Sequence, residues 1–206
     1  MTDPQLAHQL KARFDDLVSN PVEFRGELSM VLSDPERIVE VCEFARDGLK
    51  FDYLVDITSI DEYGEDPRFT LVYHLYGYGH RRYLRLKTRV SEAKGEVPSV
   101  ARVWHAANWH EREIYDMMGV RFRGHPDLRR ILMWEGYPYF PLRKDFPVAG
   151  KPSDIAETAF TEPAPMAGGP FITVAGGKDA MSREPRSRIP ESEGPRAGVG
   201  QVSRPE

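Results

Sequence analysis

The sequence predicts an α+β fold: a mixed, largely antiparallel sheet packed against helices, followed by a long irregular C-terminal arm. Two runs rich in strand-forming side chains, residues 69–76 and 82–90, flank a short glycine-containing turn and predict an antiparallel hairpin. Segments 33–46 and 108–118 space their apolar residues as amphipathic helices do. The last 56 residues contain eight prolines and seven glycines, which predicts the irregular arm. Strands grouped beside helices, without strict alternation, favour the α+β class.

The length and composition fit one globular domain with an appendage. We expect an α+β domain over residues 1–148 and an extended or partly disordered arm over 149–206. A net charge of -4 argues against a general nucleic-acid binder. No run approaches the roughly 18 apolar residues that span a bilayer, and the polar N-terminus lacks a secretory apolar region. We therefore expect a cytosolic chain that reaches a membrane only through partners.

The N-terminal region predicts a helix and two short extended pieces. Apolar residues recur on one face of the first twenty residues, until Asn20-Pro21 stops the helix. Residues 22–25 and 27–32 are then expected to be extended. The apolar face of the helix consists of Leu6, Leu10, Phe14, Leu17 and Val18.

The second helix carries boundary signals at both ends. Ser33 and Glu36 match a capping box, with Pro35 in the first turn. The helix is expected to run to about Arg46, and Gly48 ends it.

Cys42 is the only cysteine, so no internal disulfide is possible. An iron-sulfur cluster usually needs four thiolates, and this chain cannot supply them alone. Cys42 shares helical spacing with Ile38, Val41 and Ala45, which predicts that it is a buried, small apolar residue.

Residues 49–58 alternate as a half-buried strand does. One face is expected to carry Leu49, Phe51, Tyr53, Val55 and Ile57, and the other Asp52, Asp56 and Thr58. The second hairpin strand sets Leu84, Leu86 and Val90 against Tyr83, Arg85, Lys87 and Arg89. These patterns predict a sheet with one face covered by helices and one face partly charged.

The third helix combines a cap, a stop and a charged face. Asn108 and Glu111 match a capping box, and Gly119 ends the helix in the left-handed conformation. Arg112 and Asp116 stand four residues apart and are expected to pair. The apolar stripe consists of Ile114, Met117 and Met118.

Histidines near this helix invite other interpretations. A zinc-protease helix needs a second histidine four residues after His110, where Ile114 stands. His105 lies five residues from His110, a spacing that does not align them for one metal, so we expect none. His125 precedes Pro126 and is interpreted either as a pH-sensitive or proton-relay group, or as a turn residue whose ring bonds a carbonyl. The turn role is preferred.

Residues 108–132 carry the most specific signal in the chain. Glu111-Arg112-Glu113, Asp116 with two apolar residues, His125, Arg129 and Ile131-Leu132 follow one another at fixed spacing. This stretch resembles the signature of the C-type (30 kDa) subunit of proton-pumping NADH:quinone oxidoreductase, respiratory complex I. The proline-bounded segment 141–147 is a second match, and the likeness covers roughly residues 22–148.

The resemblance implies a structural subunit of a multi-subunit translocase. Such a subunit lies in the peripheral arm, on the cytoplasmic side of the cell membrane, and binds mainly the large D (49 kDa) subunit. It carries no cofactor, whereas the assembled complex holds FMN, iron-sulfur clusters and quinone. The complex couples electron transfer from NADH to quinone with proton translocation, and the isolated subunit is inactive.

The resemblance assigns the signature residues to a partner interface, with no catalytic, cofactor or metal residue. The charged residues alone fit three roles: acid–base catalysis, a solvated face, or partner contacts through arginine–carboxylate pairs, which the resemblance favours. We expect Arg112→Ala to loosen assembly while leaving the domain folded. The assigned residues are Trp109, Glu111, Arg112, Glu113, Asp116, Gly119, His125, Pro126, Arg129, Arg130, Pro141, Leu142, Arg143, Lys144, Asp145 and Phe146.

Alternatives remain open at the level of sequence. An equivalent accessory subunit of a membrane-bound hydrogenase, or of a dehydrogenase with another electron donor, shares these features. A stand-alone hydrolase using His110 and Glu111 is an alternative of a different class. Segment 141–147 suits a peptide laid along another protein or a domain-ending loop. The arm is either a floppy tail or a segment that orders on a partner.

Overall fold

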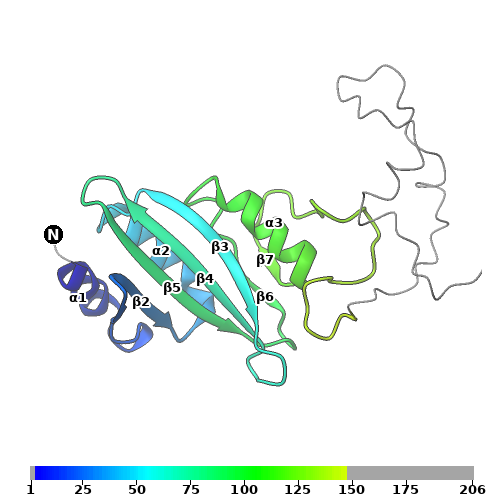
Figure 1. The fold of residues 1–206 in the computed structure, drawn as a ribbon. Helices are drawn as coiled ribbons and strands as arrows, with labels where there is room; N and C mark the ends of the chain where they lie inside the picture. Colours follow the sequence, from blue (N-terminus) through cyan, green and yellow to red (C-terminus); the bar gives the residue numbers. More distant parts are fainter. Residues whose placement is uncertain (1–2, 148–206) are drawn as a thin grey trace, which may run out of the picture. The chain divides into compact units, whose positions relative to one another are not determined.

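The computed structural model describes residues 3–147, and the expected α+β class is confirmed (Figure 1). The helices are α1 (Asp3–Phe14), α2 (Ile38–Asp47) and α3 (Ala107–Met118). The strands are β1 (Val22–Phe24), β2 (Glu27–Leu32), β3 (Tyr53–Asp61), β4 (Phe69–Gly77), β5 (Arg82–Val90), β6 (Glu96–Pro98) and β7 (Arg121–Arg123). The arm expected over residues 149–206 lies outside the described residues.

Five strands form one mixed sheet in the order β1-β2-β5-β4-β3. The β4–β5 hairpin is antiparallel, as predicted, and β3 pairs antiparallel with β4. The parallel pairing of β2 with β5 makes the sheet mixed. Strands β6 and β7 form a separate parallel pair. Figure 1 shows α2 behind the sheet, α3 beyond the β3 edge, and the near face of the sheet without a helix over it.

The core lies between the inner face of the sheet and α2. Alternate β5 residues point inward, as predicted from their spacing. Cys42 is fully buried on α2, which confirms its small apolar role, and burial raises the pKa of its thiol. The inward residues that meet this helix include Met30, Leu32, Leu71, Tyr73, Leu75, Leu84 and Leu86.

The predicted faces of β3 are wrong over its first half. Pairing with β4 shifts register between Leu54 and Asp56, as in a β-bulge. One extra residue reverses the alternation, so Leu54 and Ile57 are both buried. Tyr53 and Val55 instead lie on the open face, 44% and 37% exposed. A bulge leaves no signal in apolar spacing, because it depends on the partner strand.

Helix boundaries also differ from those predicted. The first helix ends at Phe14, and a 3-10 turn, Asp15–Leu17, follows it. Asp34, not Ser33, caps the next turn by accepting a hydrogen bond from the Glu36 N–H at 3.0 Å. Neither predicted capping box forms, since α3 begins after Ala106 with no side-chain cap. The carboxylates of Glu36 and Glu111 are instead engaged by residues distant in sequence.

Gly119 ends α3 in the left-handed conformation, with φ of 78°, as predicted. A Cβ at this position would stand 2.7 Å from the Phe140 ring and the Arg143 guanidinium. The position therefore needs glycine both for its backbone angle and for the close approach of the later segment.

We expect Gly119→Ala to lower the free energy of unfolding more than Gly124→Ala. Gly124 has a similar φ of 79°, but nothing lies within 4 Å of its added Cβ. Both variants should lose roughly 1 kcal/mol to the backbone angle, and Gly119→Ala about 1–3 kcal/mol more to overpacking. Urea denaturation measures the difference, and equal losses would contradict the close approach.

Candidate functional site

The signature residues of α3 hold the irregular segment that follows the helix. Asp116 is fully buried, and its carboxylate is the centre of this arrangement. Its Oδ1 accepts a hydrogen bond from the Arg130 guanidinium at 2.5 Å. Its Oδ2 accepts three backbone N–H bonds, from Ile131 (3.0 Å), Leu132 (2.7 Å) and Met133 (2.8 Å). One carboxylate thus accepts hydrogen bonds from three consecutive backbone N–H groups, whose residues belong to no helix or strand.

The ionised form of Asp116 is the one that this arrangement favours. Burial raises the pKa of its carboxyl, but the hydrogen bonds from three backbone N–H groups and Arg130 outweigh burial and lower the pKa below its ordinary value. The charge is therefore present at neutral pH and is compensated within the chain.

Arg112 performs a related function from the preceding turn of α3. It is 8% exposed and donates to the carbonyl oxygens of Arg129 at 3.1 Å and Arg130 at 3.2 Å. Its guanidinium also lies over the Trp109 ring, 5.1 Å from the centroid. The expected pair of Arg112 with Asp116 is therefore wrong. Both bonds lie within the domain, so Arg112→Ala is expected to lower the stability of the domain as well as to affect assembly.

Glu111 points into the core. Its carboxylate accepts bonds from the Ser99 hydroxyl at 2.5 Å and the Val100 N–H at 2.7 Å. Burial raises the pKa of Glu111 to about 7, although the bonds from Ser99 and Val100 oppose the shift. This glutamate joins α3 to the loop after β6 and has no exposed surface.

His125 is the turn residue that the preferred interpretation describes. Its Nδ1 accepts a bond from the Asp127 N–H at 3.0 Å, which leaves Nε2 to donate to the Asn108 carbonyl oxygen at 3.1 Å. Burial lowers the pKa of His125, with the Asn108 bond opposing, so the ring is neutral at pH 7. The 3.9 Å approach of Nε2 to Glu111 is therefore not an ion pair at that pH.

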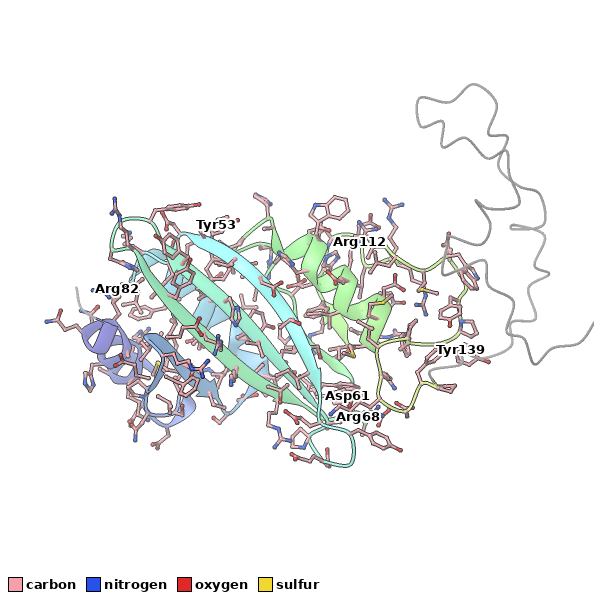
Figure 2. All side chains as sticks on the ribbon, viewed as in Figure 1. Tyr53, Asp61, Arg68, Arg82, Arg112 and Tyr139 are labelled. Atoms are coloured by element: carbon pink, nitrogen blue, oxygen red, sulfur yellow. The ribbon has the colours of Figure 1, made fainter. Side chains whose placement is uncertain are left out.

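The proline-bounded segment is held by a second charged cluster, which the sequence did not reveal. Arg68 is buried immediately before β4 and bonds both oxygens of Asp61, at 2.8 and 2.9 Å. The same guanidinium reaches Asp145, while the Lys144 N–H donates to Asp61 at 2.8 Å. Figure 2 shows Asp61 and Arg68 side by side at one end of the sheet. The only feature of the sequence that could have indicated this cluster is that Asp61 ends one strand and Arg68 comes directly before the next.

Arg143 extends the same cluster to α3. It donates to the Met118 carbonyl oxygen at 2.6 Å and to Glu92 at 2.9 Å. Its guanidinium also stacks on the Phe140 and Phe69 rings. The segment that follows Gly119 is thus bound at the C-terminal end of α3 and at the edge of the sheet.

The remaining signature residues divide by exposure. Half-buried members, besides His125, Arg130 and Arg143, are Gly119, Pro141 and Phe146. Exposed members are Trp109, Glu113, Pro126, Arg129, Leu142, Lys144 and Asp145. Three exposed apolar residues of this group and its surroundings are large: Trp109 (61%), Leu132 (63%) and Leu142 (57%).

The metal and hydrolase interpretations find no common site. His110 lies 3.2 Å from Asp56 on β3, whereas Glu111 points into the core, so the two do not face one substrate position. Within residues 3–147, no three histidine, cysteine, aspartate or glutamate side chains are placed to hold a metal. None of the helices in that range has the length and apolar character needed to cross a bilayer.

Fold and site together define a small α+β domain whose signature charges hold its own backbone while apolar side chains face outward. The chain belongs to the family described as the respiratory-chain NADH dehydrogenase 30 kDa subunit, whose model matches residues 31–152. This confirms the family that residues 108–132 indicated.

Individual relatives agree with this assignment. The chain is 50% identical over 140 residues to the second of the C-type subunits of NADH-quinone oxidoreductase in Rhizobium etli, covering 67% of this chain and 74% of the relative. It is 43% identical over 143 residues to the corresponding C-type NADH-quinone oxidoreductase subunit of Geobacter sulfurreducens, covering 69% and 88%.

Solved structures share the fold. A trypsin-resistant fragment of Nqo5 has a TM-score of 0.50 at 30% identity, covering 60% of this chain and 97% of the fragment. A chain of an archaeal membrane-bound sulfane sulfur reductase has a TM-score of 0.61 at 22% identity, covering 70% and 85%. At that identity the second likeness concerns the fold alone.

We expect Asp116→Ala to destabilise the domain by about 3–5 kcal/mol, because it removes the buried partner of Arg130 and leaves three part-buried backbone donors without their acceptor. Asp127→Ala is the control, since Asp127 pairs with Arg129 at the surface and its loss should cost under about 1 kcal/mol. Urea denaturation and hydrogen exchange at residues 131–133 provide the measurement. Unchanged exchange there would show that Asp116 does not hold the segment.

We expect Glu111→Gln to flatten the pH dependence of stability between pH 4.5, its ordinary pKa, and about 7. In that window the folded state binds more protons at Glu111 than the unfolded state does. The contribution of Glu111 is therefore complete below the unfolded pKa and falls as pH rises, by up to about 3 kcal/mol. Glutamine can still accept from Val100. Unfolding free energies of both proteins at about pH 5 and about pH 7.5 test this, and parallel changes would contradict it.

Proposed function

We propose that this chain is a cofactor-free structural subunit of the peripheral arm of a membrane-associated NADH:quinone oxidoreductase. The complex would transfer electrons from NADH to quinone and couple this transfer to proton translocation, with FMN and iron-sulfur clusters in other subunits. The chain would contribute no catalytic residue and would lie on the cytoplasmic side of the membrane. Family membership supports the assignment to this complex.

One observation supports the structural role above all. The buried signature charges are bonded within the domain: Asp116 to Arg130 and three N–H groups, Arg112 to two carbonyl oxygens, and Glu111 to Ser99 and Val100. Catalysis would need at least one such group free toward a substrate. Their geometry instead fixes the segment after α3, and this segment presents exposed apolar side chains.

The exposed residues define a surface of the composition that protein partners use. We name it the α3 surface: Trp109, Glu113, Leu132, Trp134 and Leu142. A groove lined by Met117, Met118, Leu142, Glu113 and residues of β3 runs between this helix and the sheet. Tryptophan anchors beside arginines are enriched among residues that dominate interface energies. The partner proposed for this surface is the D (49 kDa) subunit.

An equivalent accessory subunit in a complex with another electron donor is the second candidate. The shared fold with a chain of the sulfane sulfur reductase favours keeping it. The two candidates differ in the donor that the purified complex oxidises.

We expect the double variant Trp109→Ala, Leu142→Asp to lose the D subunit. Loss of a tryptophan anchor typically costs about 2 kcal/mol or more, which is roughly a thirtyfold weaker association. The variant would replace the native chain in its host, and the complex would be purified by a tag on this chain after gentle solubilisation. Recovery of the D subunit and NADH:quinone reductase activity are the readouts.

Phe24→Ala is the matched control, because Phe24 is 65% exposed on β1, away from α3. It should retain both the D subunit and the activity, and thermal melting should show both variants folded. A complex lacking this chain that kept full quinone reductase activity and stability would overturn the proposal. Clusters recovered with activity toward a donor other than NADH would favour the second candidate.

A further inference from the structure

The five-stranded sheet has a second exposed surface, on the face opposite α2. Figure 1 shows strands β3, β4 and β5 facing the viewer with α2 behind them. The pairing register places Tyr53, Tyr76 and Tyr83 in one row across these strands. Further along the same face, beyond the row of Asp56, His74 and Arg85, Val31 of β2 aligns with Lys87 of β5. Apart from the buried Val72 and Thr70 of β4, the side chains that these strands turn to this face are exposed or half-buried.

Tyrosines form a rigid platform at one end of this face. The Tyr76 ring lies 4.7 Å from Tyr83 and 5.2 Å from Tyr78, and Tyr78 lies 5.6 Å from Tyr53. Tyr53, Tyr78 and Tyr83 are nevertheless 44%, 61% and 55% exposed. Tyr53 stands at the opposite end of β3 from Asp61 (Figure 2). Rings already held by one another lose little conformational entropy when a partner covers them.

Two of the cations on this face have carboxylate partners. Arg85 pairs with Glu27 and Arg89 with Glu65 at 2.7 Å, while the Asp56 carboxylate lies 3.2 Å from the His110 ring. Lys87 stands between Arg85 and Arg89 along β5 and is half-buried. Its ammonium forms no ion pair with any residue of the described part of the chain.

The neighbours of Lys87 define what would complement it. Val31, directly across on β2, is 43% exposed, and Val72, directly across on β4, is buried. A half-buried ammonium among valines lacks the counter-ion that would offset its partial loss of hydration. A carboxylate carried by an apolar segment supplies both the charge and the contact.

We propose that this face, which we name the tyrosine–lysine face (Val31, Tyr53, Tyr76, Tyr78, Tyr83 and Lys87), binds an acidic segment of a second protein subunit of the complex. The inference rests on the proposed function and extends it. The α3 surface binds one subunit and the tyrosine–lysine face binds another, so the chain bridges two neighbours. A nucleic acid fits less well, since the net charge is -4 and the flanking arginines are neutralised.

The experiment is zero-length carbodiimide cross-linking of the purified complex, followed by mass spectrometry. The reagent joins a lysine amine to a carboxylate only when the two are in direct contact. We expect Lys87 to be linked to an aspartate or glutamate of a subunit other than the D subunit. Lys87→Arg is the matched control: it keeps the positive charge and the assembly but removes the reactive amine, so this link alone should disappear.

A charge reversal provides the second readout. Lys87→Glu should reduce retention of the cross-linked subunit about tenfold, a change of roughly 1.4 kcal/mol, and leave the D subunit in place. Arg102→Glu makes the same charge change at an exposed position outside this face and should leave both subunits bound. Thermal melting of each variant chain shows whether it is folded.

The outcomes separate this proposal from the proposed function. If the chain is present in the complex but Lys87 stays unlinked, or acetylates equally fast in the free chain and in the complex, the tyrosine–lysine face is not an interface. A link to the D subunit alone overturns the bridging of two neighbours. If Lys87 forms no link to a protein but the chain binds a single-stranded oligonucleotide in a way that depends on Lys87, the partner of this face is a nucleic acid and the proposal is overturned. Absence of the chain from the complex overturns the proposed function and this proposal with it.

Discussion

Residues 124–147 run without helix or strand, and the backbone groups of this segment still need hydrogen-bond partners. Asp116 meets this need from inside the fold, accepting three consecutive N–H bonds and one guanidinium. A backbone donor left buried without an acceptor costs about 1–3 kcal/mol. A second carboxylate, Asp61, bound to Arg68, holds the same segment further on. Buried carboxylates here supply the hydrogen bonds that a neighbouring strand would supply in a sheet. The position of the segment, and with it the shape of the α3 surface, depends on these bonds.

This arrangement inverts the usual distribution of residue types around α3. The charges Glu111, Arg112 and Asp116 lie inside, whereas Trp109 and Leu142 lie outside. Buried charges are tolerated because each meets oppositely charged or dipolar groups of the chain. The exposed apolar side chains have no such compensation in the monomer. The same residues that fix the segment therefore also fix the geometry of the surface that the segment exposes.

Sequence patterns located most of the regular structure. The β4–β5 hairpin, α2 with its buried Cys42, and the stop at Gly119 all rest on local spacing, and the structure confirms them. The candidate site was found by its motif, but its contacts were not. The Arg112–Asp116 pair and the capping box at Asn108 obey local rules, yet the carboxylates of Glu111 and Asp116 accept hydrogen bonds from residues elsewhere. Asp61 and Arg68 were overlooked because neither belongs to a periodic pattern.

Local patterns were enough to predict the fold class, and the motif spacing carried the resemblance to the family, because period, turn chemistry and motif spacing are properties of the sequence itself. What the signature residues bind was established only by contacts between distant parts of the fold. Lys144 meets Asp61 across 83 positions, and a bulge in β3 turns Tyr53 and Val55 to the open face. Such choices follow from competition among distant partners for each buried donor and acceptor, and that competition exists only once the chain is folded.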